Sequence, residues 1–223
     1  MYVLTLGRIY LVAMAPSETS RRNVKKASKM SNPVEKLQCL PAHEDRKTLD
    51  GEIISFETYW ATHLSKEQET WVFELFKQNM YALYSMSQWG WDPESKKAEL
   101  GATTARFIIA KNERGENIGY THYRFDMDHN CPVLYCRGSF DMSIFSYEIQ
   151  VEEKYQKKGV GTLLMQTLET LAEKTGMEKV MATVFAFNEK SLGFFHKLGY
   201  ETDVTCPDEN QGRDYLILSK TIS

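Results

Sequence analysis

The chain has 223 residues, of which 42% are hydrophobic and 12% aromatic, so it is long and apolar enough to bury the core of one domain. Its formal net charge of −3 argues against a protein coated in basic side chains for bulk nucleic-acid binding. No apolar run approaches the roughly 18–20 residues that cross a membrane, so we expect no membrane partner.

The cysteines show neither a C-x-x-C pair nor a zinc spacing. We therefore expect no metal site, and we expect reduced thiols in an intracellular protein, with a disulfide pair as the alternative. The residues concerned are Cys39, Cys131, Cys136 and Cys206.

The first residues, MYVLTLGRIYLVAMA, are weakly like the apolar part of a signal peptide, but no basic segment precedes them and Arg8 interrupts the run. We interpret residues 1–13 as a start-site or gene-model artefact before Met14, with a targeting peptide as the alternative. Residues 14–32 are basic, which fits a solvated tail or frayed helix as well as a nuclear-import or acid-binding segment. We expect residues 1–31 to be a tail and residues 32–223 to form one domain.

The first predicted elements of the domain are a strand and a long helix. A short strand is expected near residues 53–56, after the turn signal Asp50-Gly51. Ser65 and Gln68 have the spacing of a capping box, and apolar residues then recur at helical spacing from residue 71 to residue 84. Gly90 and Pro93 are expected to break this helix.

A hairpin is predicted next, with strands at residues 105–111 and 118–126 and a turn between them. The remaining pattern predicts strands at 133–136, 145–151, 179–187 and 215–220, and helices at 162–175 and 190–198 that end at glycines. This order predicts an α/β fold whose mixed, predominantly antiparallel sheet is flanked by helices.

The segment Gln156-Lys-Lys-Gly-Val-Gly161 lies between a predicted strand and a predicted helix. A helix N-terminus offers free N–H groups and partial positive charge, and glycines let phosphate oxygens approach the backbone closely. We predict a diphosphate site here. The dinucleotide fingerprint fails because Leu164 stands at its third glycine, and the P-loop pattern fails because no G-K-[ST] follows.

This loop, followed after the next strand by FNEKSLGFFHKLGYE, resembles the Gcn5-related N-acetyltransferase (GNAT) superfamily. The resemblance implies the GNAT fold and acetyl-CoA as the acetyl donor. Many members of the superfamily protonate the leaving thiolate with a tyrosine, whereas Phe194 and Phe195 stand at that place here. The residues that the resemblance assigns to the coenzyme are Ile149, Gln150, Val151, Gln156, Lys157, Lys158, Gly159, Val160, Gly161, Thr162 and Asn188.

Further stretches, above all YSMSQWGW at residues 84–91, are similar to the N-alpha-acetyltransferase D family, over about residues 33–220. That family acetylates the amino termini of histones 2A and 4, which begin Ser-Gly-Arg-Gly. The resemblance implies N-alpha-acetyltransferase activity, histone tails as partners and a place in nucleus and cytoplasm. It also implies that the enzyme is active without an auxiliary subunit, with residues 32–84 wrapping the core. We expect no specific nucleic-acid sequence as a partner.

The resemblance places the catalytic glutamate of the D family at Glu148, which is the predicted general base. An α-amine of pKa near ~8 needs only one positioned carboxylate. The alternative is an exposed glutamate at a sheet edge. Asp126 and Asp128 form a predicted carboxylate pair for a substrate arginine, or else cap a turn. The resemblance places further residues in the peptide groove, where the aromatic ones could equally be core: Tyr84, Trp89, Met127, Tyr147, Thr183 and Tyr215.

Residues 137–146 are extra relative to the D family and precede Tyr147 and Glu148. Because their number is even, strand alternation across them is preserved. They either loop out at the groove mouth, reflect a splicing or annotation error, or disrupt the site. Three functions follow: a histone N-terminal acetyltransferase, an acetyltransferase for lysines or small amines, and a non-catalytic coenzyme- or histone-binding module.

Overall fold

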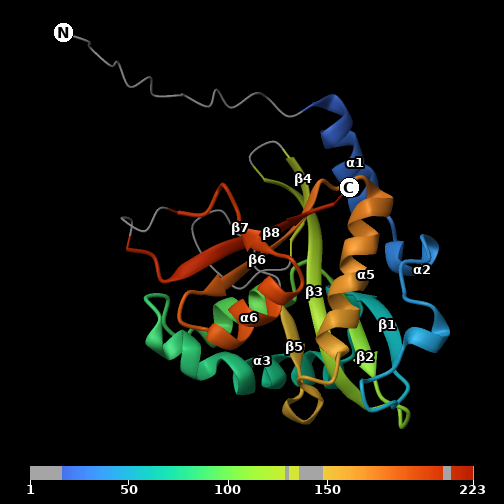
Figure 1. The fold of residues 1–223 in the computed structure, drawn as a ribbon, viewed down its shortest axis with the longest axis vertical. Helices are drawn as coiled ribbons and strands as arrows, with labels where there is room; N and C mark the ends of the chain where they lie inside the picture. Colours follow the sequence, from blue (N-terminus) through green and yellow to red (C-terminus); the bar gives the residue numbers. More distant parts are fainter. Residues whose placement is uncertain (1–16, 129–130, 136–147, 208–211, 223) are drawn as a thin grey trace.

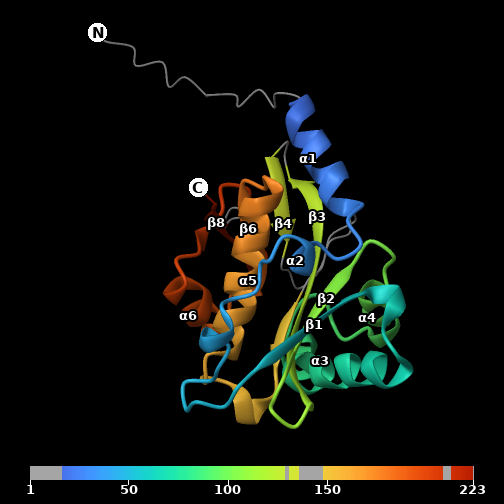
Figure 2. The same ribbon diagram turned by 90° about the vertical axis from the view of Figure 1, so that its right-hand side faces the viewer.

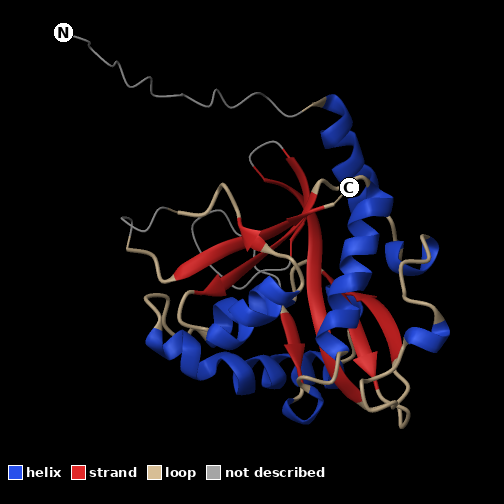
Figure 3. Ribbon diagram, in the orientation of Figure 1, coloured by secondary structure: helices blue, strands red, loops and turns tan. Residues whose placement is uncertain are grey.

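The chain folds around one mixed sheet with helices on both of its faces (Figures 1 and 3). The structure is a computed structural model that describes residues 17–128, 131–135, 148–207 and 212–222. The strand order is β1-β2-β3-β4-β6-β8-β7, with β5 paired to β3 beside this path. The strands are β1 Ser55–Trp60, β2 Arg106–Lys111, β3 Asn117–Asp128, β4 Cys131–Tyr135, β5 Ile149–Val151, β6 Lys179–Phe185, β7 Glu201–Thr202 and β8 Tyr215–Thr221.

The described pairs are antiparallel except for β4 and β6, which run parallel. The predicted mixed α/β fold is thus confirmed, and the predicted strand limits differ from these by a few residues. The strand expected from residue 145 is described only from Ile149, because residues 136–147 lie outside the described part.

The helices form two layers, seen most clearly in Figure 2. Helices α3 and α4 pack on one face of the sheet, and α1, α2 and α5 pack on the other. No helix in the described part is both long enough and apolar enough to cross a membrane. The helices are α1 Glu18–Ser28, α2 Pro33–Lys36, α3 Lys66–Met86, α4 Pro93–Leu100, α5 Val160–Thr175 and α6 Glu189–Lys197, with short 3₁₀ turns η1 His43–Asp45, η2 Ala61–His63 and η3 Glu153–Tyr155.

Strand β2 shows how one sheet serves two cores. Its side chains point alternately to opposite faces, so Phe107 and Ile109 pack with the α3 side and Ile108 and Ala110 with the α5 side. These residues are fully buried, as expected for a strand covered on both faces. The sheet is therefore a rigid support for residues at its centre.

Helix α1 differs from the expectation of a tail over residues 1–31. From Glu18 onward the chain is helical, with Ser17 as its N-cap and Ala27 buried against the domain. The guanidinium of Arg106 donates to the carbonyl oxygens of Ser28 and Met30, 2.7 and 3.0 Å away, and so binds the end of the helix. The basic side chains lie on the exposed side of α1, while residues 1–16 are outside the described part.

Helix α4 was not predicted: α3 ends at Met86, before Gly90 and Pro93 as expected, and Pro93 then begins a new helix. Asp92 is the N-cap, and its Oδ1 accepts hydrogen bonds from the N–H groups of Glu94 and Ser95. Proline is well suited to the first helical position, where its missing N–H would have no helical partner. This helix carries Lys96 and Leu100 to the interior.

Strand β3 pairs with two later segments of the chain, β4 and β5, and the two pairings have different registers. Arg124 faces Tyr135 in β4, and His122 exchanges backbone hydrogen bonds with Glu148 just before β5. Arg124 and His122 are two residues apart in β3, whereas their partners Tyr135 and Glu148 are thirteen residues apart in the chain. The extra residues 137–146 fall in this interval, outside the described residues, while the chain on both sides of it pairs with β3.

Candidate active site

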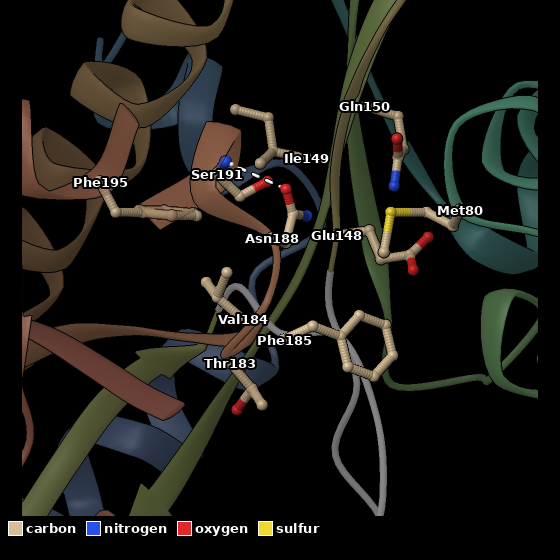
Figure 4. Close-up of a pocket in the computed structure, with 10 residues that line it drawn as sticks. All are labelled: Met80, Glu148, Ile149, Gln150, Thr183, Val184, Phe185, Asn188, Ser191 and Phe195. Atoms are coloured by element: carbon tan, nitrogen blue, oxygen red, sulfur yellow. Dashed lines mark hydrogen bonds between the residues drawn. The ribbon is translucent and has the colours of Figure 1, made fainter. Parts of the chain in front are cut away.

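A cleft opens where β5 and β6 separate (Figure 4). It holds about 450 Å³ of empty space, including its open mouth. Its floor comes from the start of β5, one wall from β6 and another from the first turn of α6, with Met80 of α3 completing it. The lining residues are Met80, Glu148, Ile149, Gln150, Thr183, Val184, Phe185, Asn188, Ser191 and Phe195.

The edge of β5 that faces away from β3 has no strand on it among the described residues. Glu148 exchanges backbone hydrogen bonds with His122, at 2.7 and 3.2 Å, and the Glu152 N–H donates to Ile118 at 2.9 Å. In an antiparallel ladder these bonds alternate, so the N–H groups of Ile149 and Val151 point away from β3. The strand thus offers backbone donors to a molecule in the cleft.

Glu148 is buried at the floor of the cleft, with 4% of its surface exposed. The alternative of an exposed edge glutamate therefore does not hold. Burial raises the pKa of Glu148 to about 7, although the Lys96 ammonium, which donates to Oε1 at 3.2 Å, acts to lower it. A carboxyl group that titrates near neutral pH is well matched to accepting a proton from an amine.

Lys96 of α4 is a residue that the sequence interpretation missed. It is 4% exposed, and besides Glu148 it donates to Glu99 Oε1 at 2.9 Å and lies 4.6 Å from the centre of the Phe76 ring. The neighbouring carboxylates raise the pKa of Lys96, so it is charged at neutral pH. The one available signal was its spacing of four residues from Leu100, which is too common to single out a buried lysine.

The predicted diphosphate loop leads into α5 with an open helix N-terminus. Gly159 is its N-cap, with φ of 91°, and no side chain caps the helix. The first N–H groups of a helix have no partner within it, so those of Val160, Gly161 and Thr162 can donate to an anion. A Cβ on Gly161 would lie 3.2 Å from the Phe194 ring, which leaves little room for a side chain.

The polar side chains of this loop have neighbours of their own. Lys158 Nζ forms an ion pair of 2.8 Å with Asp50, and the Leu49 N–H donates to the Lys158 carbonyl oxygen at 2.9 Å. Gln156 Nε2 donates to the carbonyl oxygen of Val151 at 3.1 Å, and Lys157 adopts a positive φ of 60°. The charge of Lys158 is thus shared with Asp50. The backbone N–H groups at the start of α5 are therefore the main donors that could bind a diphosphate.

Asn188 joins the loop after β6 to helix α6. Its Oδ1 accepts a hydrogen bond of 3.2 Å from the Ser191 N–H and so caps the helix, and both residues line the cleft (Figure 4). Its amide NH₂ group is a further donor on that wall. Phe195 lines the cleft nearby, while Phe194 lies over Gly161, and neither can donate a proton.

Of the residues predicted to contact a peptide, Thr183 lines the cleft and three aromatic residues lie behind it. The ring of Phe185, on the wall, is 5.2 Å from Tyr84 and 4.8 Å from Trp89, and Trp89 is 5.1 Å from Tyr215. Tyr84 and Tyr215 are buried. These aromatic rings pack on one another and support the cleft wall.

The predicted carboxylate pair lies farther along β3. Thr121 is opposite Ile149 in β5, and Asp126 comes five residues later, roughly 16 Å along the strand. Asp126 pairs with Arg124 at 2.6 Å and accepts from the Met127 N–H at 2.7 Å, and it is not among the cleft-lining residues. Asp128 ends β3 opposite Cys131, its side chain is outside the described part, and so is Tyr147.

Comparisons with known proteins agree with this fold. The model of the acetyltransferase (GNAT) family matches residues 57–200. The N-acetyltransferase YdgE of Bacillus subtilis is 29% identical over 89 residues, which cover 40% of this chain and 50% of that protein. The match thus spans about half the length of this curated relative.

Solved structures share the fold at low sequence identity. The GNAT domain of S. lividans PAT has a TM-score of 0.57 and 15% identity, covering 81% of this chain and 98% of that one. The acetyltransferase YncA of Salmonella typhimurium, solved with acetyl-CoA, has a TM-score of 0.51 and 16% identity, covering 75% and 94%. Among the described residues, no group of His, Cys, Asp and Glu side chains is arranged to hold a metal ion.

Proposed function

Because the chain belongs to the acetyltransferase (GNAT) family, we propose that it transfers acetyl from acetyl-CoA to the free α-amine of histone tails that begin Ser-Gly-Arg-Gly, as in histones 2A and 4. The observation that carries the chemistry is the buried Glu148 carboxyl at the floor of a cleft edged by backbone donors. The choice of acceptor rests on the resemblance of residues 84–91 and neighbouring stretches to the D family.

When bound, acetyl-CoA supplies an activated thioester. The open N-terminus of α5 would hold its diphosphate, and the free edge of β5 with Asn188 would hold the pantetheine arm. These elements, with the loop between β5 and α5, carry the residues predicted for the coenzyme from the sequence.

Glu148 accepts the proton of the attacking amine, directly or through one water, as the nitrogen–carbon bond forms and the carbon–sulfur bond breaks. The N–H group of Ile149 would stabilise negative charge on the carbonyl oxygen, while that of Val151, about 7 Å along the strand, would hold the pantetheine arm. With phenylalanines at 194 and 195, solvent protonates the leaving thiolate, whose pKa near ~8.5 requires little help.

The histone assignment has one specific competitor. Asp126, the expected partner of a substrate arginine, is already paired with Arg124, so a peptide arginine would have to displace that side chain. This favours, as the second candidate, a lysine or small-amine acceptor. For the first candidate we propose action in nucleus and cytoplasm, on histone tails, without an auxiliary subunit.

The test is acetyl transfer to two peptides. The purified protein and acetyl-CoA are incubated with a Ser-Gly-Arg-Gly-Lys peptide, and separately with the same peptide carrying a blocked α-amine, and products are located by mass spectrometry. Acetylation of the free α-amine alone is expected, and Glu148→Gln should lower its rate roughly 10²- to 10⁴-fold. Modification of the blocked peptide would instead identify a lysine enzyme, and binding of acetyl-CoA without transfer to either would contradict the proposal.

A further inference from the structure

The ion pair beneath the cleft joins two groups that are each buried. The side chains of Lys96 and Glu148 are 4% and 2% exposed, and 3.2 Å separates Nζ from Oε1. Leaving either charge without its partner at such depth costs several kcal/mol, so the pair fixes both side chains. An ion pair that only stabilised the fold would not have to lie at the floor of a cleft. Here, however, Glu148 lines the cleft.

The two carboxylate oxygens of Glu148 are held unequally. Oε1 accepts from Lys96. Oε2 is 3.4 Å from the Tyr120 hydroxyl, which also lies 3.2 Å from the carbonyl oxygen of Val72 and is shared with it. One oxygen is therefore firmly bound, and the other keeps most of its capacity to accept a hydrogen bond.

We propose that Lys96 is a positioning residue for Glu148: its ammonium binds one carboxylate oxygen and leaves the other to take the proton of the substrate amine. The inference rests on the proposed acetyl transfer. Glu99, the second carboxylate on Lys96 at 2.9 Å, opposes this effect because its negative charge lies near that of Glu148. Lys96 and Glu99 thus act on Glu148 in opposite directions.

The other groups that face this cluster are uncharged near neutral pH. From β3, burial raises the pKa of Tyr120 well above its ordinary value and lowers the pKa of His122 well below its own. From α3 come the rings of Phe76 and Tyr84, 4.6 and 5.6 Å from the Lys96 ammonium. The balance between Lys96 and Glu99 therefore dominates the local field.

The experiment follows the titration of Glu148 directly, by NMR of protein labelled with ¹³C at glutamate carboxyls and assigned by the signal lost in Glu148→Gln. Lys96→Met should raise the titration midpoint by about one pH unit or more, and Glu99→Gln should lower it. The matched control is Lys97→Met, since the adjacent Lys97 side chain is 52% exposed, forms an ion pair with Glu94 and lies over the Phe73 ring, away from Glu148. It should leave the midpoint unchanged.

The kinetic readout is the pH dependence of kcat/KM for the peptide. Its acidic limb should move with the NMR midpoint, and Lys96→Met should lower kcat about 10- to 100-fold at pH 7 with little change in the KM for acetyl-CoA. Lys96→Arg, which keeps the positive charge, should leave the acidic limb of the pH profile at its wild-type position.

A midpoint unmoved in Lys96→Met, or raised in Glu99→Gln, overturns the proposal. If Lys96→Met does not fold, Glu99→Gln and Lys96→Arg carry the same test. If Lys96→Met raises the Glu148 midpoint and Glu99→Gln lowers it, but the wild-type protein acetylates neither peptide, then Lys96 still controls Glu148. In that case only the assignment of histone tails as the acceptor is refuted.

Discussion

Gly159 illustrates how a single backbone position can matter to binding. Its φ of 91° lies in a region that a side chain rarely adopts, and it ends the loop at the open N-terminus of α5. Gly115 has a similar φ of 77° in the β2–β3 turn, and a Cβ added there would have no atom within 4 Å of it. The two glycines therefore have similar φ angles and different surroundings.

We expect Gly159→Ala and Gly115→Ala each to lower the free energy of unfolding by about 1–2 kcal/mol, because alanine is strained at positive φ. Only Gly159→Ala should also weaken CoA binding, since it moves the N–H groups at the start of α5 that we propose hold the diphosphate. Chemical denaturation and calorimetric titration with CoA measure the two effects. Equal CoA affinity in both variants would show that the loop does not bind the diphosphate.

At the scale of elements, β5 depends on its close contact with β3. A Cβ on Gly119 would meet the Gln150 carbonyl oxygen at 2.9 Å and the Val151 Cα at 3.3 Å, both in the backbone of β5. These backbone atoms of β5 cannot move aside as the end of a flexible side chain could. A methyl group here therefore pushes β5, and with it the floor of the cleft, away from the sheet.

Gly119→Ala is expected to cost about 1–3 kcal/mol of stability, as overpacking usually does, and to reduce acetyl transfer. The control is Gly193→Ala in the middle of α6, where no atom lies within 4 Å of the added Cβ. That change should stabilise the protein by about 0.5–1 kcal/mol, because alanine favours helices. Thermal unfolding and the peptide assay report both, and full activity in Gly119→Ala would refute this role of β5.

The elements that the sequence predicted well are those with strong local signals. The capping box at Ser65 and Gln68 is present, and the long helix it opens was placed correctly. Two elements have ambiguous signals: α4 was not predicted, and α1 was left open between a solvated tail and a frayed helix. Pro93 marks a helix start as readily as a helix end, and the basic side chains of α1 hide its small apolar stripe at Val24 and Ala27.

The site was predictable only where one segment carries it. The loop at 156–161 and Glu148 could be proposed from the sequence because a short motif and a family resemblance cover them, and the structure places Glu148 in the lining of the cleft. Lys96 could not, because its meeting with Glu148 joins residues 52 positions apart through tertiary packing. The ion pair between Arg124 and Asp126 was missed for a different reason, since alternation allows that contact without requiring it.

For the whole molecule, the raised pKa of Glu148 predicts a pH-dependent stability. The native state keeps the Glu148 proton up to about pH 7, whereas the unfolded chain releases it near 4.5. Between these values the native state binds more protons, so the free energy of unfolding falls as pH rises, by about 3 kcal/mol in total. His122, whose pKa is lowered, acts in the opposite direction below its ordinary value of 6.5.

The measurement is therefore a difference between wild type and Glu148→Gln, in which the contribution of His122 largely cancels. Urea unfolding from pH 4 to pH 8 should show wild type losing stability relative to the variant as pH rises. Below that range the lowered pKa of Asp203, about 2, predicts a separate loss in both proteins as acid protonates it. A constant difference from pH 4 to pH 8 would mean that Glu148 titrates as in the unfolded chain.

The double register beside β3 has a consequence for how this chain can change over time. Glu148 is held by its own bonds to His122, and β4 by its own pairs with residues 124–128, so neither depends on how many residues join them. Insertions and deletions between 136 and 147 are then free to accumulate without displacing Glu148. Among descendants of a common ancestor, this stretch should vary in length while the residues on either side keep their places.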